Sequence, residues 1–264
     1  MVKNKMVISV CAVMLMAATT GAEQVFAADW PAVLQQIKAK YSQFGNDIQD
    51  ISITQQMTTV APEGTMVIEM TLLQKGKKFR SEGSMNMPGA PSGMGPMKTT
   101  VIFDGKDTWM IAPMMGKKKL SPQESKDQQK DKNWWELVSE QAKITGMEQT
   151  GGRECYVVAM NDPENAPFTR MWLDKNNLVL MKMESKGRKR EPVVIEFSDF
   201  KKVKGEWEMP YKTEMYANGK LMSTIQVKAL QVNKGVADEQ FDAGKVPVEK
   251  QGFPMGDMMK QMMR

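Results

Sequence analysis

The sequence predicts an α+β fold in which a curved antiparallel sheet carries helices on one face. After a first helix-like segment, apolar and polar residues alternate with a period of two over most of the chain. This pattern is typical of strands with one exposed face. Turn sequences such as Asp104-Gly105 and Asn218-Gly219 separate the alternating segments and favour hairpins. One long meander, preceded by one helix and interrupted by another, is an α+β layout.

The first element expected in the fold is a helix that begins at Asp29 and ends near Gly45. Asp29 is a suitable N-cap, and Pro31 suits the first helical turn. The apolar residues recur at spacings of three and four, which indicates an amphipathic helix; they are Trp30, Val33, Leu34, Ile37 and Tyr41.

Strands follow from Ile51 onward. Residues 65–73 alternate, and residues 77–87 should return antiparallel to them. Residues 101–113 form a hairpin around Asp104-Gly105 that carries Trp109 and stops at Pro113. The polar stretch 121–132 is expected to be a loop, and a helix capped by Asn133 is expected to run to Ala142. The remaining predicted strands span residues 153–160, 168–173, 178–185, 191–200, 205–217 and 220–232.

The N-terminal residues 1–27 are predicted to be a Sec-type signal peptide. Lys3 and Lys5 precede an uncharged, mostly apolar run, and Ala27 ends a small-x-small cleavage site. An uncleaved anchor is the alternative, although the run is short for a membrane span. Cleavage after Ala27 would place the protein in the periplasm. A single domain over residues 28–247 and a Met-rich tail over residues 248–264 would remain.

The residue composition narrows the function. The chain contains no histidine, so no Ser-His-Asp triad, Cys-His pair or His metal site can form. No GxSxG, P-loop or Rossmann motif is present. We therefore expect no enzyme activity, no cofactor and no metal site. The net charge of +5 is spread over scattered basic residues, so a nucleic-acid partner is not expected.

Cys155 would be the only cysteine left after cleavage, so no intramolecular disulfide could form. It lies beside Tyr156 and Val157 in an apolar segment. A buried structural thiol is the favoured interpretation over a reactive one.

Several motifs, taken in order, resemble the LolA-type family of outer-membrane lipoprotein carriers and sorting proteins. Residues 103–109, followed by Pro113, are similar to the family's DGKxxW…P hairpin. Residues 170–183 are similar to its xxWIDKxxxLPxKM hairpin, and residues 197–200, 205–210 and 232–236 resemble its closing strands. The resemblance implies an unclosed β-barrel with helices covering the open side and an apolar cavity between them. Family members bind acyl chains of lipoproteins or other lipids and carry them through the periplasm.

The predicted lipid-binding residues combine the apolar strand faces with tryptophans, and each could equally be plain core. They are Met66, Ile68, Met70, Leu72, Trp109, Trp134, Trp135, Val193, Ile195, Phe197, Trp207, Met215, Ile225 and Val227. The family's carriers hold a lid shut with an Arg; here Lys75 stands at the matching place, and Arg80 is the alternative. The expected partners are acyl chains, with donor and acceptor proteins in the inner or outer membrane. The carrier is expected to be a monomer.

The methionine clusters leave further alternatives open. Met85, Met87, Met94 and Met97 crowd one segment, and five methionines stand between Met255 and Met263. They could be surface material, a lid over the cavity, or thioether ligands for Cu(I). A Met-rich Cu(I)-binding protein, or an envelope lipid sensor of the same fold, is therefore the alternative to a carrier.

Overall fold

A computed structural model describes residues 29–61, 64–86, 95–113, 115–128, 134–162, 168–186 and 191–248. The predicted signal peptide, its cleavage site, Asn133, Met87, Met94 and the tail beyond Val248 lie outside these residues. Within the described ranges, none of the helices combines the length and apolar character needed to cross a membrane.

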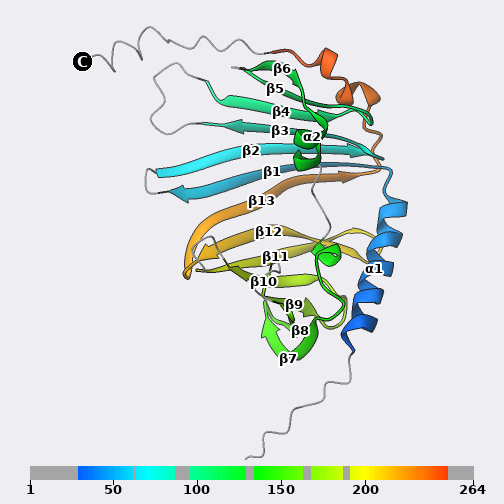
Figure 1. Ribbon diagram of the computed structural model, residues 1–264, viewed down its shortest axis with the longest axis vertical. Coiled ribbons are helices and arrows are strands. Elements are labelled where there is room, and N and C mark those ends of the chain that lie inside the picture. Colours follow the sequence, from blue (N-terminus) through cyan, green and yellow to red (C-terminus); the bar gives the residue numbers. More distant parts are fainter. Residues whose placement is uncertain are drawn as a thin grey trace, which may run out of the picture.

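The described residues form one antiparallel sheet of thirteen strands in the order β6-β5-β4-β3-β2-β1-β13-β12-β11-β10-β9-β8-β7 (Figure 1). The edge strands β6 and β7 do not pair with each other, so the sheet stays open. The predicted curved, unclosed antiparallel sheet is confirmed. The strands are β1 (Asp50–Ala61), β2 (Gly64–Lys75), β3 (Lys78–Met85), β4 (Met97–Phe103), β5 (Thr108–Ala112), β6 (Gly116–Lys119), β7 (Lys143–Thr150), β8 (Arg153–Ala159), β9 (Arg170–Asp174), β10 (Leu180–Lys186), β11 (Pro192–Lys204), β12 (Trp207–Ala217) and β13 (Lys220–Val232).

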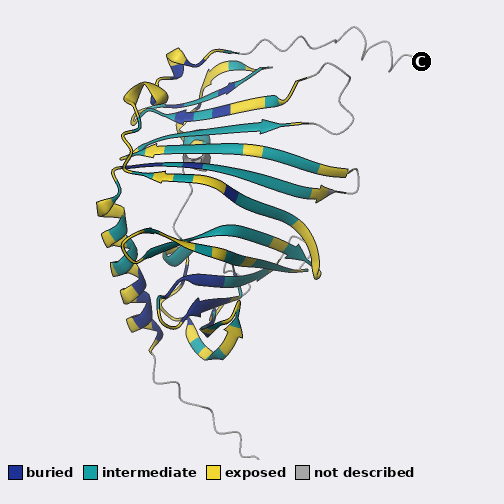
Figure 2. Cartoon of the chain, turned by 180° about the vertical axis from the view of Figure 1, so that it is seen from behind, coloured by how far each residue is buried: buried dark blue, intermediate teal, exposed yellow. Residues whose placement is uncertain are grey.

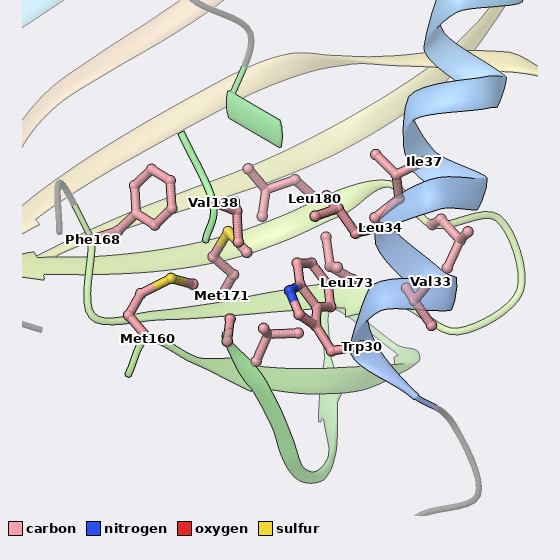
Figure 3. Packing of buried hydrophobic residues seen from close by; sticks show 13 residues of the cluster. Trp30, Val33, Leu34, Ile37, Val138, Met160, Phe168, Met171, Leu173 and Leu180 are labelled. Carbon is pink, nitrogen blue, oxygen red and sulfur yellow. The ribbon is translucent and has the colours of Figure 1, made fainter. Parts of the chain in front are cut away.

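The helix α1 (Trp30–Asp47) packs its apolar side on strands β8 to β10, as Figure 3 shows. Its buried residues Trp30, Val33, Leu34 and Ile37 share a core with Met171, Leu173 and Leu180 of the sheet. Asp29 makes no side-chain capping bond, but its carbonyl accepts the Val33 N–H at 3.1 Å. The helix predicted from the 3–4 spacing is therefore confirmed, and its contacts are those of the apolar stripe.

The segment between β6 and β7 differs from the prediction. A short helix, α2 (Pro122–Gln128), stands where a loop is expected. Its start is a capping box, because Ser121 N–H donates to Glu124 Oε2 at 2.8 Å and Glu124 N–H donates to Ser121 Oγ at 3.3 Å. The Ser121-to-Glu124 spacing that marks such a box is present in the sequence. In Figure 1 the helix α2 lies in front of the sheet.

The predicted helix up to Ala142 is wrong, because only the short 3₁₀ turn η1 (Trp134–Glu136) forms in this part of the described chain. Beyond it, the Trp30 indole Nε1–H donates to the Ser139 carbonyl at 3.0 Å. Val138 and Ala142 are buried in the α1 core. The contact with Trp30 and the burial of these two residues fix an irregular path that a regular helix would not follow.

The strand register defines two faces of the sheet. We call the face on which α1 and η1 lie the inner face. Residues that pair directly across neighbouring strands form one apolar row on the inner face, from β11 to β4. Thr213 is the single polar residue in this row. The row consists of Phe197, Thr213, Ile225, Met57, Ile68, Met85 and Met97.

Bulges change which residues reach the inner face. The β1–β13 register shifts between Thr54 and Gln55, so that Val227 pairs with Gln55 and Leu230 pairs with Ile53. Strict alternation would have placed Ala229 on the same face of the sheet as Val227. Instead Leu230 joins the cluster of Ile51, Ile53 and Val227.

The outer face of the sheet carries its own core. Cys155, Trp172 and Met181 are buried together there, with Phe200 packed against them. The short turns η2 (Asp238–Phe241) and η3 (Ala243–Lys245) cover Ile102 and Ile111 at the other end of the sheet. The apolar interior is thus divided between two faces.

Cys155 is expected to react slowly with thiol reagents in the folded protein. Burial raises the pKa of its thiol to about 11, so at pH 8 the folded chain holds far less reactive thiolate than the unfolded chain. Labelling by a chromogenic disulfide should be at least tenfold slower without urea than with it, measured on a Cys11→Ala variant so that Cys155 is the thiol that reacts. The folded chain also keeps this proton between about pH 9 and 11, so the free energy of unfolding should decrease as pH rises there. Equal labelling rates with and without urea would contradict a buried thiol. The Cys155→Ala variant gives the background signal.

Candidate functional site

An apolar pocket of about 590 Å³ lies between the C-terminal half of α1, η1 and strands β10 to β12, and it reaches the start of β1. Seven aromatic side chains line it. They are Tyr41, Phe44, Trp134, Trp135, Phe197, Phe200 and Trp207. A pocket of this size and lining is in the range that small apolar ligands occupy.

The aromatic rings pack against one another in fixed geometries. Tyr41 stacks on Trp135 with ring centroids 4.2 Å apart, and Trp134 stands nearly perpendicular to both rings. Phe44 stacks on Trp207 at 6.1 Å. Since Tyr41 and Phe44 are three residues apart on α1, they face the same side of the helix. The helix and η1 thus form an aromatic wall opposite the sheet.

The carboxylates beside the pocket are already engaged. Glu208 Oε2 accepts hydrogen bonds from Arg153 Nη1 at 3.0 Å and from Asn177 Nδ2 at 2.8 Å. Asp50 is buried and accepts from the backbone N–H groups of Lys234 and Gly235. The pocket therefore presents mainly apolar surface to a ligand, and its acidic groups hold the surrounding loops.

Burial shifts the pKa values of Tyr41, which lines the pocket, and of its neighbour Lys40. Burial lowers the pKa of Lys40, against the opposing effect of Glu208 and other carboxylates. Burial also raises the pKa of Tyr41 to about 12, and Glu208 adds to this rise. The Lys40 ammonium donates to the Asn177 carbonyl and lies 5.9 Å from the Tyr41 ring centroid. Both shifts have the sign that removal of water gives.

The predicted lipid-binding residues separate into three groups. Trp134, Trp135, Phe197 and Trp207 line the pocket. Trp109 lies on the outer face, in the core under the C-terminal turns. The others share the inner face with the pocket, by register; they are Met66, Ile68, Met70, Leu72, Val193, Ile195, Met215, Ile225 and Val227.

The two predicted latch residues contact the C-terminal turn η2. Lys75 and Lys78 each lie 2.8 Å from a carboxylate oxygen of Asp238. These two ion pairs lower the pKa of Asp238 to about 2. Arg80 Nη1 donates to the Gln240 carbonyl at 2.9 Å and the same guanidinium pairs with Glu82. A role for Lys75 or Arg80 in latching a lid stays a prediction.

The pocket residues absent from the predicted set include the large side chains of Tyr41, Phe44, Met183, Phe200 and Met209. The three-residue spacing of Tyr41 and Phe44 indicates that both rings lie on the same side of the helix. Phe200 could not be found by alternation, because its pairing with Pro210 keeps it on the face opposite to Phe197. Phe200 packs against the outer-face core and also lines the pocket.

The described methionines on the inner face include a direct cross-strand pair, Met85 and Met97. Among the residues that the structure describes, no group of three or more His, Cys, Asp or Glu side chains is placed to hold a metal ion.

A family model described as "-like: Uncharacterized protein" matches residues 92–246. The chain belongs to this family. None of the curated protein sequences matches the chain.

Solved structures with the same fold are more informative. A Vibrio parahaemolyticus protein, assigned as an outer membrane lipoprotein-sorting domain, is 17% identical with a TM-score of 0.52, over 81% of this chain and 96% of that one. A DUF1329 family protein from Desulfovibrio piger is 14% identical with a TM-score of 0.55, over 83% and 100%. A LolA superfamily protein from Nitrosomonas europaea is 15% identical over 83% and 100%, with a TM-score of 0.47. The chain shares the fold of the Vibrio lipoprotein-sorting domain and of the Desulfovibrio protein, in agreement with the fold that its motifs predicted.

Proposed function

We propose that the protein is a periplasmic carrier that binds acyl chains of lipoproteins or other lipids and transfers them across the cell envelope without chemical change. The observation that carries the proposal is the aromatic pocket, which opens onto the apolar row of the inner face. Phe197 belongs to both, so apolar surface continues from the pocket along the sheet. In this proposal residues 28–247 act as one lipid-binding domain.

The chemistry of the site supports binding over catalysis. The acidic groups near the pocket are held by Arg153, Asn177 and backbone N–H groups, and the rings offer only apolar contact and stacking. Methionine side chains on the inner face are flexible and polarizable, which suits acyl chains of varied length. The Vibrio relative's assignment to lipoprotein sorting points to the same class of ligand.

The proposal is tested by native mass spectrometry and solvent extraction of the protein purified after export. We expect acyl lipids to copurify, or a fluorescent fatty-acid probe to load into the lipid-free protein. If no acyl ligand copurifies and none can be loaded, the carrier proposal fails. An enzymatic role would instead appear as chemical alteration of the added lipid over time.

Charges on the inner face should weaken ligand binding. We expect Ile68→Asp or Ile195→Asp to reduce probe affinity several-fold, because each places a carboxylate beside the acyl chain. Ile68 and Ile195 are half-buried on the inner face. Val67→Asp and Val194→Asp are matched controls, since these neighbours point to the outer face. Probe titration measures the difference, and full binding by both inner variants would mean that the ligand does not use this face.

A further inference from the structure

Four large apolar side chains are exposed at one end of the sheet. Val60 is 46% exposed, Leu221 is 40% exposed, and Met215 and Met222 are each 38% exposed. They lie near the end of β1 and on the hairpin of β12 and β13. Figure 1 shows these strand ends on the side of the sheet away from α1, and Figure 2 shows exposed residues at both. We call these four residues the tip patch.

The pairing of the strands holds the tip patch together. Ser223 pairs with both Thr59 and Met215, and Leu221 pairs with Tyr216. Val60 directly follows Thr59, and Met222 directly precedes Ser223. The Asn218 N–H donates to the Pro192 carbonyl at 3.1 Å, which ties the hairpin turn to the start of β11. The patch is therefore built on hydrogen-bonded strands.

The surroundings of the patch are suited to an anionic surface. Lys220 is exposed beside Leu221, and Lys186 is exposed on β10, which ends beside the start of β11. The nearby carboxylate of Glu214 is 2.9 Å from Lys212 Nζ, which offsets its charge. Apolar side chains with flanking lysines are the arrangement that anchors proteins at anionic bilayer surfaces.

The size and the position of the patch favour a lipid surface over a protein partner. A stable protein interface engages about 20–30 residues on each side, whereas this patch has four large apolar residues at strand ends. Met215 also faces inward, in the row that joins Ile195 and, through Ser223 and Thr59, Met66. Met215 is thus the member of the patch that continues the apolar inner face, whereas Val60 and Leu221 lie on the outer side by register.

We propose that the tip patch docks the protein on the surface of an anionic lipid bilayer, with Leu221 and Met222 entering the headgroup region and Lys220 contacting the anionic headgroups. Docking in this way brings the open inner face next to the bilayer. The proposal goes beyond cargo binding and is measured separately from it.

The test is flotation of the protein, purified after export in its processed form, with vesicles of phosphatidylethanolamine and phosphatidylglycerol and with vesicles of phosphatidylcholine alone. We expect binding to the anionic vesicles that weakens in high salt. The double variant Leu221→Ser/Met222→Ser should bind at least fivefold less, and Lys220→Glu should lose binding to the anionic vesicles. Met115→Ser and Leu137→Ser are matched controls, because both residues are exposed apolar side chains outside the patch.

Folding and cargo binding are checked on the same variants by thermal unfolding and by fatty-acid probe titration. Unchanged unfolding and probe affinity, with lost flotation, support the docking surface. Wild-type protein that does not float with anionic vesicles overturns the proposal, as does a double variant that floats like the wild type. If size-exclusion chromatography shows a dimer that the double variant abolishes, the patch binds a second copy, and the membrane proposal fails.

Discussion

Changing Phe197 to Asp should lower the affinity of the protein for an acyl probe about a hundredfold. Phe197 lines the pocket and continues the apolar row of the inner face. A carboxylate at this place must lose water when the ligand enters, which costs about 3 kcal/mol. Since about 1.4 kcal/mol is tenfold in affinity, the loss should be visible by probe titration and by lipid copurification.

Ser198→Asp is the matched control for this variant. Ser198 pairs with Lys212 on the outer face, so the same charge there should leave probe affinity unchanged. Circular dichroism and thermal unfolding establish that both variants fold. Equal affinity of a folded Phe197→Asp protein and the wild type would show that the pocket is not where the chain binds acyl groups.

Replacing Leu34 with Ala should lower the free energy of unfolding by about 3 kcal/mol. Leu34 is 1% exposed and belongs to the core that joins α1 to strands β8 to β10. Removal of its side chain leaves a cavity under the helix that carries Tyr41 and Phe44. Urea unfolding followed by tryptophan fluorescence measures the change.

Gln35→Ala is the control for the loss of side-chain atoms on the same helix, because Gln35 is exposed. Its effect should stay within about 0.5 kcal/mol. The Leu34→Ala protein should also hold the acyl probe more weakly, since the loosened helix forms one wall of the pocket. A Leu34→Ala protein as stable as the Gln35→Ala protein would mean that α1 is not a structural part of the domain.

Much of the fold could be predicted because it depends on local patterns. The strand over residues 220–232 was predicted with the bounds of β13, because Asn218-Gly219 marks its turn and the alternation is long. The strand β6 could not be found this way. Its residues, Gly116–Lys119, have no apolar alternation, and it exists by pairing with β5. Ion pairs of Lys118 with Glu124 and Lys119 with Asp107 occupy its charged side chains.

The candidate site was only partly predictable, because alternation gives two faces for each strand but does not say which face meets which element. Trp109 alternates as regularly as any strand residue, and yet it packs under Phe241 from the far end of the sequence. Phe197 and Trp207 were predicted and do line the pocket, since each follows the inward alternation of its own strand. Phe200 lies on the face opposite to Phe197 by register, and yet it also lines the pocket.

The sequence by itself determined the apolar side of α1, the hairpins and the alternating strands, because helix and strand periods act over a few neighbouring residues. Only the tertiary structure decided where the pocket lies. Its walls come from Tyr41, Trp134 and Trp207, which the strand register and the packing of η1 against α1 bring together. This arrangement minimises the exposed apolar area of the whole chain, and that total area cannot be worked out from any short stretch of the sequence.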